Sequence, residues 1–372
     1  MFLNRYYPDF IDNAKIQKQL MKRISFMIVC IIVCVGCTDN DGYTGRQYEE
    51  GDTSSLQIFS VTVDEAAGVS TRGTEALAEG SSIGIYLQGT KKDGKTECDP
   101  IFNRHYKHTA KGWGPTVPND TIYLYQEKAQ VSAYYPYDTN MKYTGISYDE
   151  ETGTETGRTD YPEMIPLTTQ PYDALKELFI DIHSEADLWN RKVKFNLTHA
   201  YSRLKLSIVR GSDYPLSICK LSSVVLSNDS LFSKGVLDMT DRKVKILPDD
   251  LYRKEIGQYA VPASCGTGSS LPYEFNDVDT KYEIDLLVVP TQLKPDPSDE
   301  TKGLAIVVNV GGLPATVMVP LKDLSGLERG KEYTISMLLN GVELSSPMVT
   351  VTGWDEKVLN GGVDYEPVPQ PK

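Results

Sequence analysis

Apolar and polar residues alternate along most of the chain after residue 55, and this period of two predicts β-strands. The clearest case is Val193, Phe195 and Leu197, which alternate with polar residues. The predicted strands are 56–63, 83–87, 122–125, 131–135, 193–197, 204–208, 221–226, 282–289, 304–310, 315–319, 333–339 and 348–354. Many short strands with almost no helix predict an all-β fold, either a sandwich or a barrel.

Turn signals refine this pattern. Gly311-Gly312 and Asn340-Gly341 each separate two strand segments and predict tight hairpins. The first predicted strand, Leu56–Val63, changes phase once at Phe59-Ser60, which predicts a β-bulge. Pro136 cannot donate a backbone hydrogen bond, so the strand before it is expected to end there or to lie at an edge.

Two segments depart from the strand pattern. Residues 141–162 are rich in Thr, Gly and Glu and are expected to form an exposed loop. Within residues 172–189, Leu175, Leu178 and Ile182 follow helical spacing, which fits a short helix.

The start of the chain has the features of an export signal. Ile24–Val35 is an apolar run that follows two basic residues and is too short to span a bilayer. The sequence that ends at Cys37 is similar to a bacterial lipobox, which would make Cys37 an acylated first residue, although Cys34 stands where Leu is usual. Ordinary secretion is the alternative. We expect residues 1–36 to be the signal peptide, with Met21 as the true start and residues 1–20 an extension.

Composition divides the chain after the signal into a tether and a larger folded part. Residues 37–55 are polar and Gly-rich and are expected to form a flexible tether. The chain after the tether is long enough for two domains or one large β domain. We expect two sandwiches in tandem, residues 56–188 and residues 189–372, the second ending in a Pro-rich tail.

Charge and cysteine content exclude several classes of function. The net charge of −13 makes nucleic acid and anionic membrane surfaces poor partners. Only Cys98, Cys219 and Cys265 lie in the body, which is too few for a disulfide framework and not at metal-ligand spacing. Three free thiols, or one disulfide and one thiol, both remain open.

The sequence contains no recognised catalytic motif. Neither a nucleophile elbow nor a phosphate-binding loop is present, so no enzyme activity and no cofactor are expected. The pair His105 and His108 lacks further ligands, and no metal site is expected. His199 continues the inward phase of the preceding strand and is expected to be a core histidine.

Several short motifs, in this order and spacing, resemble the fimbrillin family of Bacteroidales, the type V pilins. Besides the lipobox, they are Ser70-Thr71-Arg72, Gly80–Tyr86, Val131–Tyr137, Val193–Ala200 with Arg203–Leu206, Gly330–Ile335 and Val349–Trp354. The resemblance covers nearly the whole chain after the signal. It implies two transthyretin-like sandwiches, export as a lipoprotein and display on the outer membrane as part of a fimbrium.

The resemblance also implies assembly by strand exchange. In this family a trypsin-like protease removes the first strand, and a strand from a neighbouring subunit fills the groove. Carried over to this chain, Cys37 is the lipid site, Leu56–Val63 is the removable strand, and cleavage after Arg72 leaves Gly73 as the new first residue. Other fimbrial subunits and a host or bacterial surface receptor are the implied partners. The short Pro-rich tail favours a tip or accessory subunit.

Two further expectations concern glycans. Thr121 and Ser230 lie in short sequons that resemble O-glycosylation sites of this bacterial group. The alternative function is a surface lipoprotein that binds glycan without polymerising. That function needs clustered exposed aromatic residues, and the candidates are Trp113, Tyr106, Tyr123 and Tyr125.

Overall fold

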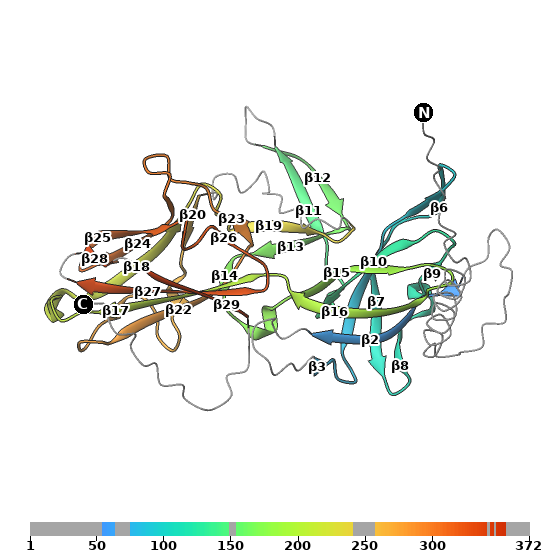
Figure 1. Ribbon diagram of the computed structural model, residues 1–372, viewed down its shortest axis with the longest axis horizontal. Helices are drawn as coiled ribbons and strands as arrows, with labels where there is room; N and C mark the ends of the chain where they lie inside the picture. Colours follow the sequence, from blue (N-terminus) through green and yellow to red (C-terminus); the bar gives the residue numbers. More distant parts are fainter. Residues whose placement is uncertain are drawn as a thin grey trace, which may run out of the picture. The chain divides into compact units, whose positions relative to one another are not determined.

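Strands form nearly all of the regular structure in the computed structural model (Figure 1). The structure describes residues 54–63, 75–148, 154–240, 257–340, 343–345 and 347–354. Within these ranges there is no α-helix, and the 3-10 helices are η1 (Pro118–Asp120), η2 (Ala174–Lys176), η3 (Leu216–Ile218) and η5 (Ala263–Cys265). The prediction of an all-β fold is therefore confirmed. The predicted signal and most of the tether lie outside the described residues.

The first half of the chain builds an eight-stranded sheet. In spatial order its strands are β3 (Glu75–Ala76), β2 (Gln57–Val63), β16 (Lys192–His199), β15 (Phe179–Ala186), β10 (Ala129–Tyr135), β4 (Ser82–Leu87), β7 (Ile101–Thr109) and β8 (Gly112–Pro115). β15 pairs with β10 along its length but with β16 only at Phe179 and Ile180. β2 is also in contact with β8, the strand at the other end of this order. One apolar cluster, which we call the first core, contains buried residues of β2, β4, β7, β10 and β16.

The second half forms a sandwich of two sheets. One contains β14 (Gln170–Pro171), β22 (Lys281–Val288), β17 (Ser202–Arg210), β27 (Lys331–Asn340), β28 (Glu343–Leu344) and β29 (Met348–Gly353). The other contains β20 (Gln258–Ala260), β18 (Lys220–Ser227), β24 (Lys302–Val310), β25 (Leu313–Pro320) and β21 (Tyr273–Glu274). Buried residues of both sheets share one cluster. Gly311 and Gly312, both with positive φ, join β24 to β25, which confirms that predicted hairpin.

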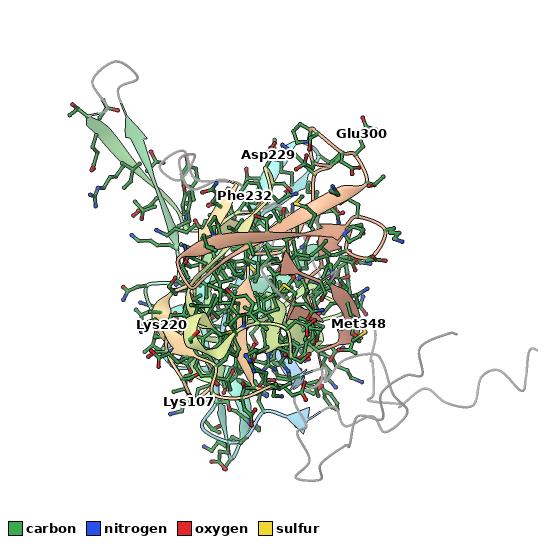
Figure 2. All side chains as sticks on the ribbon, turned by 90° about the vertical axis from the view of Figure 1, so that its left-hand side faces the viewer. Lys107, Lys220, Asp229, Phe232, Glu300 and Met348 are labelled. Carbon is green, nitrogen blue, oxygen red and sulfur yellow. The ribbon has the colours of Figure 1, made fainter. Side chains whose placement is uncertain are left out.

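Five pairs of strands form small separate sheets. They are β1 (Ser54–Ser55) with β9 (Tyr123–Leu124), β5 (Thr90–Lys92) with β6 (Lys95–Cys98), β11 (Tyr143–Tyr148) with β12 (Glu155–Tyr161), β13 (Met164–Thr168) with β19 (Lys234–Asp238), and β23 (Thr291–Gln292) with β26 (Gly326–Leu327). The expectation of a loop at residues 141–162 is wrong, because β11 and β12 form a hairpin there. The rings of Tyr143 and Tyr161 stack across the hairpin with centroids 5.8 Å apart. In Figure 2 this pale-green hairpin projects away from the packed side chains.

The helix expected within residues 172–189 is also wrong. Only one turn is helical: the Asp173 side chain accepts a hydrogen bond from the Leu175 backbone N–H at the start of η2, and the side chain of Leu175 is exposed. Beyond it, Phe179–Ala186 is extended as β15 and pairs with β10. Pairing with a neighbouring strand has overridden the local helical spacing.

Strand β16 lies on the other side of the predicted domain boundary. Its residues follow position 188, yet it pairs with β2 and β15 in the sheet of the first half. Residues Gly51–Lys372 form one compact unit by their contacts. The division into residues 56–188 and 189–372 therefore stays a prediction.

A third apolar cluster, which we call the junction, contains residues from both halves of the described chain, among them Tyr86, Ile180, Leu287 and Trp354. The indole of Trp354 is fully buried and stacks on the His199 imidazole, with ring centroids 4.0 Å apart and planes 6° apart. His199 Nδ1 is hydrogen bonded to the buried Glu177 carboxylate. His199 is thus a core histidine with a partner, as its phase in the sequence predicted.

The three described cysteines, Cys98, Cys219 and Cys265, are buried free thiols. Burial raises the pKa of each thiol, to about 11 for Cys265. Because the thiolate is the reactive form, these cysteines are expected to be inert in the folded protein. No helix in the described part of the chain is long and apolar enough to cross a membrane.

The buried indole gives a test of the junction. We expect Trp354→Ala to lower the free energy of unfolding by about 3–5 kcal/mol, because it empties a fully buried site. Trp189→Ala is the control, since this side chain is 45% exposed, and its cost should be about 1 kcal/mol or less. Urea unfolding measures both. Equal losses for the two variants would contradict this role of Trp354.

Candidate functional site at the first strand

Strand β2 lies beside β16 (Figure 1), and we call the position that it fills next to β16 the groove. The two strands run parallel, with Lys192 opposite Gln57 and Leu197 opposite Val63. On its other side β2 pairs through its last two residues with the two-residue edge strand β3, and the Val61 carbonyl oxygen accepts a hydrogen bond from the Leu77 N–H. Most of the length of β2 is therefore held by one neighbouring strand.

The inward face of β2 completes the first core. Leu56, Ile58 and Val61 are buried and belong to the same cluster as Val193 and Phe195 of β16. Burying one such side chain stabilises a fold by roughly 1.5–3 kcal/mol. Without β2, the groove would expose the apolar side chains of β16 and its unpaired backbone groups.

The bulge predicted in this strand is present. Ile58 pairs with Val193 and Ser60 with Lys194, so Phe59 is an extra residue with no register partner on β16. Its side chain is 66% exposed, and the Lys194 ammonium lies 5.1 Å from the centroid of its ring. The prediction of a bulge at Phe59-Ser60 is confirmed.

A few polar contacts hold the ends of the strand. The Gln57 backbone N–H donates to the Arg191 carbonyl oxygen at 2.9 Å, and the Leu56 N–H donates to the Ile122 carbonyl at 2.8 Å. At the other end, the Thr62 hydroxyl lies 3.3 Å from the Phe195 carbonyl oxygen. Hydrogen bonds of this kind contribute about 1 kcal/mol each, so apolar burial is the main attachment.

The predicted processing and lipidation residues, Arg72, Gly73 and Cys37, lie outside the described residues. Arg72 and Gly73 belong to residues 64–74, which connect β2 to β3. Val63 and Glu75, the described residues on either side, are register partners. The connection that contains Arg72 therefore starts and ends at one edge of the sheet.

The two candidate glycosylation residues differ in environment. Thr121 is half-buried at the end of η1. Ser230 is only 6% exposed, and its Oγ lies 2.7 Å from Asn228 Oδ1 and 2.5 Å from the Gln292 carbonyl oxygen. A glycan on Ser230 would have to displace these hydrogen bonds. Both sequons stay predictions.

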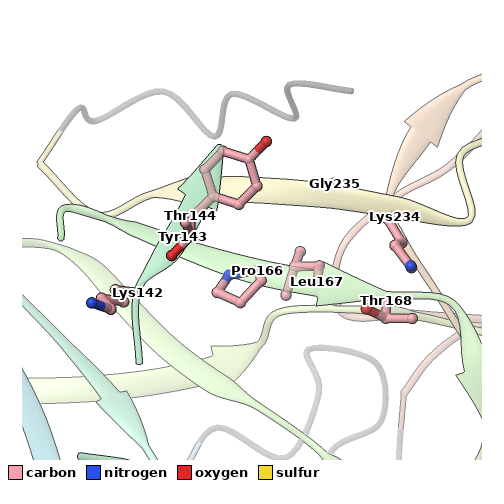
Figure 3. A pocket seen from close by; sticks show the side chains of 8 residues that line it. All are labelled: Lys142, Tyr143, Thr144, Pro166, Leu167, Thr168, Lys234 and Gly235. Atoms are coloured by element: carbon pink, nitrogen blue, oxygen red, sulfur yellow. The ribbon is translucent and has the colours of Figure 1, made fainter. Parts of the chain in front are cut away.

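The aromatic residues considered for glycan binding do not form one exposed face. Tyr106 is buried and its hydroxyl accepts a hydrogen bond from the Ile122 N–H, while Trp113 and Tyr125 are half-buried against the first core. Only Tyr123 is largely exposed. None of them lines the pocket of about 330 Å³ in Figure 3, which is lined by Lys142, Tyr143, Thr144, Pro166, Leu167, Thr168, Lys234 and Gly235.

His105 and His108 are not brought together as ligands. They lie on opposite faces of β7, and their rings stack on Tyr137 and Trp113 respectively. Among the residues whose placement is described, no group of three or more His, Cys, Asp or Glu side chains could hold a metal ion.

Comparison with known proteins identifies the family. The sequence profile of the fimbrillin-like family matches residues 70–354. The chain belongs to the fimbrillin-like family. This fimbrillin-like chain therefore carries β2 ahead of the matched range, whereas β16, which pairs with β2, lies within it.

Solved structures from Bacteroides resemble the fimbrillin-like chain. A fimbrial protein from Bacteroides vulgatus is 14% identical, with 81% of this chain and 100% of that chain covered and a TM-score of 0.44. A candidate cell adhesion protein from Bacteroides uniformis is 16% identical, with 81% and 99% covered and a TM-score of 0.41. No curated protein sequence matches this chain.

Sequence reasoning missed the partner of β2. The alternation in Val193–Leu197 indicated a strand with one buried face, but no local signal says which strand lies beside it. A parallel pair needs a long connection between its strands, and here β2 and β16 are separated by most of the first half.

Substitutions on the two faces of β2 test how the strand is held. We expect Ile58→Ala to reduce the free energy of unfolding by about 2–5 kcal/mol, because it leaves a cavity in the first core. Phe59→Ala, on the exposed face, should change it by about 0.5 kcal/mol or less. Denaturant unfolding of both variants provides the measurement. A larger loss for Phe59→Ala than for Ile58→Ala would show that β2 is not held by its inward face.

Proposed function

We propose that this chain is a structural or adhesive subunit of a type V fimbria that assembles by donor-strand exchange. In this proposal the chain is exported as a lipoprotein acylated at Cys37 and displayed on the outer membrane. A protease cleaves after Arg72, β2 leaves the groove beside β16, and a strand of a neighbouring subunit replaces it.

The position of β2 is the observation that carries the proposal. β2 and the preceding Leu56 supply three buried side chains to the first core, yet β2 has a full-length neighbour on one side only. The segment that ends at Arg72 can leave without separating any strand pairs other than the two-residue pairs of β2 with β3 and of β1 with β9. The chain after Gly73 retains the other strands of the sheet.

The empty groove would bind a strand for two physical reasons. The edge of β16 would present unpaired N–H and C=O groups, and the apolar side chains behind it would lose their cover. An extended segment satisfies both at once, since its backbone pairs with the edge while alternate side chains fill the trough. No observation in the described residues favours the alternative of glycan binding.

The role of Arg72 is tested by the first residue of the assembled protein. We expect intact mass and N-terminal sequencing to give Gly73 for subunits in sheared filaments and acylated Cys37 for the outer-membrane precursor. Arg72→Ala should abolish the shorter form and the filaments, because a trypsin-like protease requires a basic residue before the cut.

Two matched variants control this experiment. Arg72→Lys keeps a basic residue and should still be processed, and Arg46→Ala removes an arginine of the predicted tether and should leave processing unchanged. Filaments built from a form that still begins at Cys37 would refute cleavage after Arg72.

Lipidation has a separate test. We expect Cys37→Ala to abolish palmitate labelling and to release the protein from the outer membrane, because the acyl chains would be its anchor. Cys98→Ala is the matched control, since this thiol is buried in the first core and should have no part in anchoring. Membrane fractionation after labelling measures both effects. Unchanged labelling of Cys37→Ala would exclude Cys37 as the lipid site.

A further inference from the structure

The inward-facing residues of β16, which forms the wall of the groove, and those of β2, which occupies it, have different spacings along the chain. On β16, Val193, Phe195 and Leu197 follow one another at intervals of two residues and form a regular wall. On β2, the inward residues Ile58 and Val61 are three residues apart. The bulge absorbs the extra residue.

This mismatch weakens the hold of β2. A bulge leaves one residue unpaired and locally disrupts the ladder, and bulges are rare in parallel pairs such as this one. Here the unpaired residue is Phe59, whose ring is turned to solvent. An apolar side chain is thus exposed at the position where backbone pairing is interrupted.

A strand with unbroken alternation fits the same wall better. It can place apolar side chains opposite Val193, Phe195 and Leu197 with one residue between each, so that every residue pairs and no aromatic ring is left outside. Its side chains would fill the inward positions that Ile58 and Val61 occupy now, without a bulge between them.

We propose that the bulge at Phe59 makes β2 a replaceable occupant, and that the groove prefers a partner strand of strictly alternating apolar and polar residues running parallel to β16. This inference rests on the proposed function, because it specifies which strand takes the place of β2. Between its first and last inward-facing side chains, the partner strand has one residue fewer than β2. The groove distinguishes the partner from β2 by this shorter spacing.

A deletion within the full-length chain tests the inference directly. Removing Phe59 joins Ile58 to Ser60, and both residues keep their partners Val193 and Lys194. We expect hydrogen exchange of the β2 amides to become about tenfold slower in the deletion variant, because restoring one backbone pair is worth about that factor. Exchange that is equal or faster in the folded variant would overturn the proposal.

Phe59→Ser is the matched control. It removes the aromatic ring but keeps the number of residues, and so it keeps the bulge. We expect its β2 amides to exchange at the rate of the unmodified chain within about twofold. Slowing equal to that of the deletion would assign the effect to the exposed ring and would overturn the proposed role of the bulge.

Peptide competition provides a second measurement if the deletion variant does not fold. Two peptides are added to the chain cleaved after Arg72: Leu-Gln-Ile-Phe-Ser-Val-Thr-Val, the sequence of residues 56–63, and the same sequence without Phe. We expect the shorter peptide to release β2 at about tenfold lower concentration. Equal potency, or failure of both peptides, would overturn the inference.

The result is distinguishable from a failure of the proposed function. Amide exchange in the uncleaved chain depends on neither protease nor neighbouring subunit, so slower exchange without Phe59 would hold even if no filament forms. Conversely, filaments that begin at Gly73 together with unchanged amide exchange would support strand replacement and reject the role of the bulge.

Discussion

The buried stripe of Leu56, Ile58 and Val61 is the interaction on which the first core depends. These side chains come from the start of the described chain and close a cluster whose other members lie on strands from residue 83 onward. Together they contribute several kcal/mol, which is comparable to the whole stability of a typical domain. A first core that lost β2 without a substitute would be marginally stable. Departure and replacement of the strand therefore have to be closely coupled.

The wall of the groove is held in place independently of β2. β16 ends at His199, whose ring stacks on Trp354 and whose Nδ1 bonds to Glu177. Just beyond, the Arg203 guanidinium lies 3.7 Å from the centroid of the Tyr172 ring. These contacts fix the end of β16 whether or not β2 is present. A groove whose wall keeps its shape needs less reordering when a new strand arrives, which lowers the free-energy cost of binding.

Local chemistry explains which features the sequence could predict. Gly311 and Gly312 adopt positive φ, which the residue type itself favours, and the phase slip at Phe59 is visible within one strand. The hairpin of β11 and β12 and the strand Phe179–Ala186 were missed, because each is extended through pairing rather than by a clear alternation of its own. The parallel partner of β2 was beyond local reasoning, since it depends on the path of the entire first half.

The tether and the bulge of β2 both affect the equilibrium between β2 and a competing strand in the groove. While β2 is attached through residues 64–74, its return to the groove is intramolecular, and a tether of that length can favour it by factors of about 10²–10⁴ over a free strand. A competitor with equal contacts could not displace it. Cleavage after Arg72 removes the tether on that side but leaves the contacts of Ile58 and Val61 intact. After cleavage alone, β2 and a competitor with equal contacts would therefore bind the groove equally well. The bulge at Phe59 then gives a regular partner strand the advantage, and the direction of exchange follows from the spacing of residues on β2 and β16.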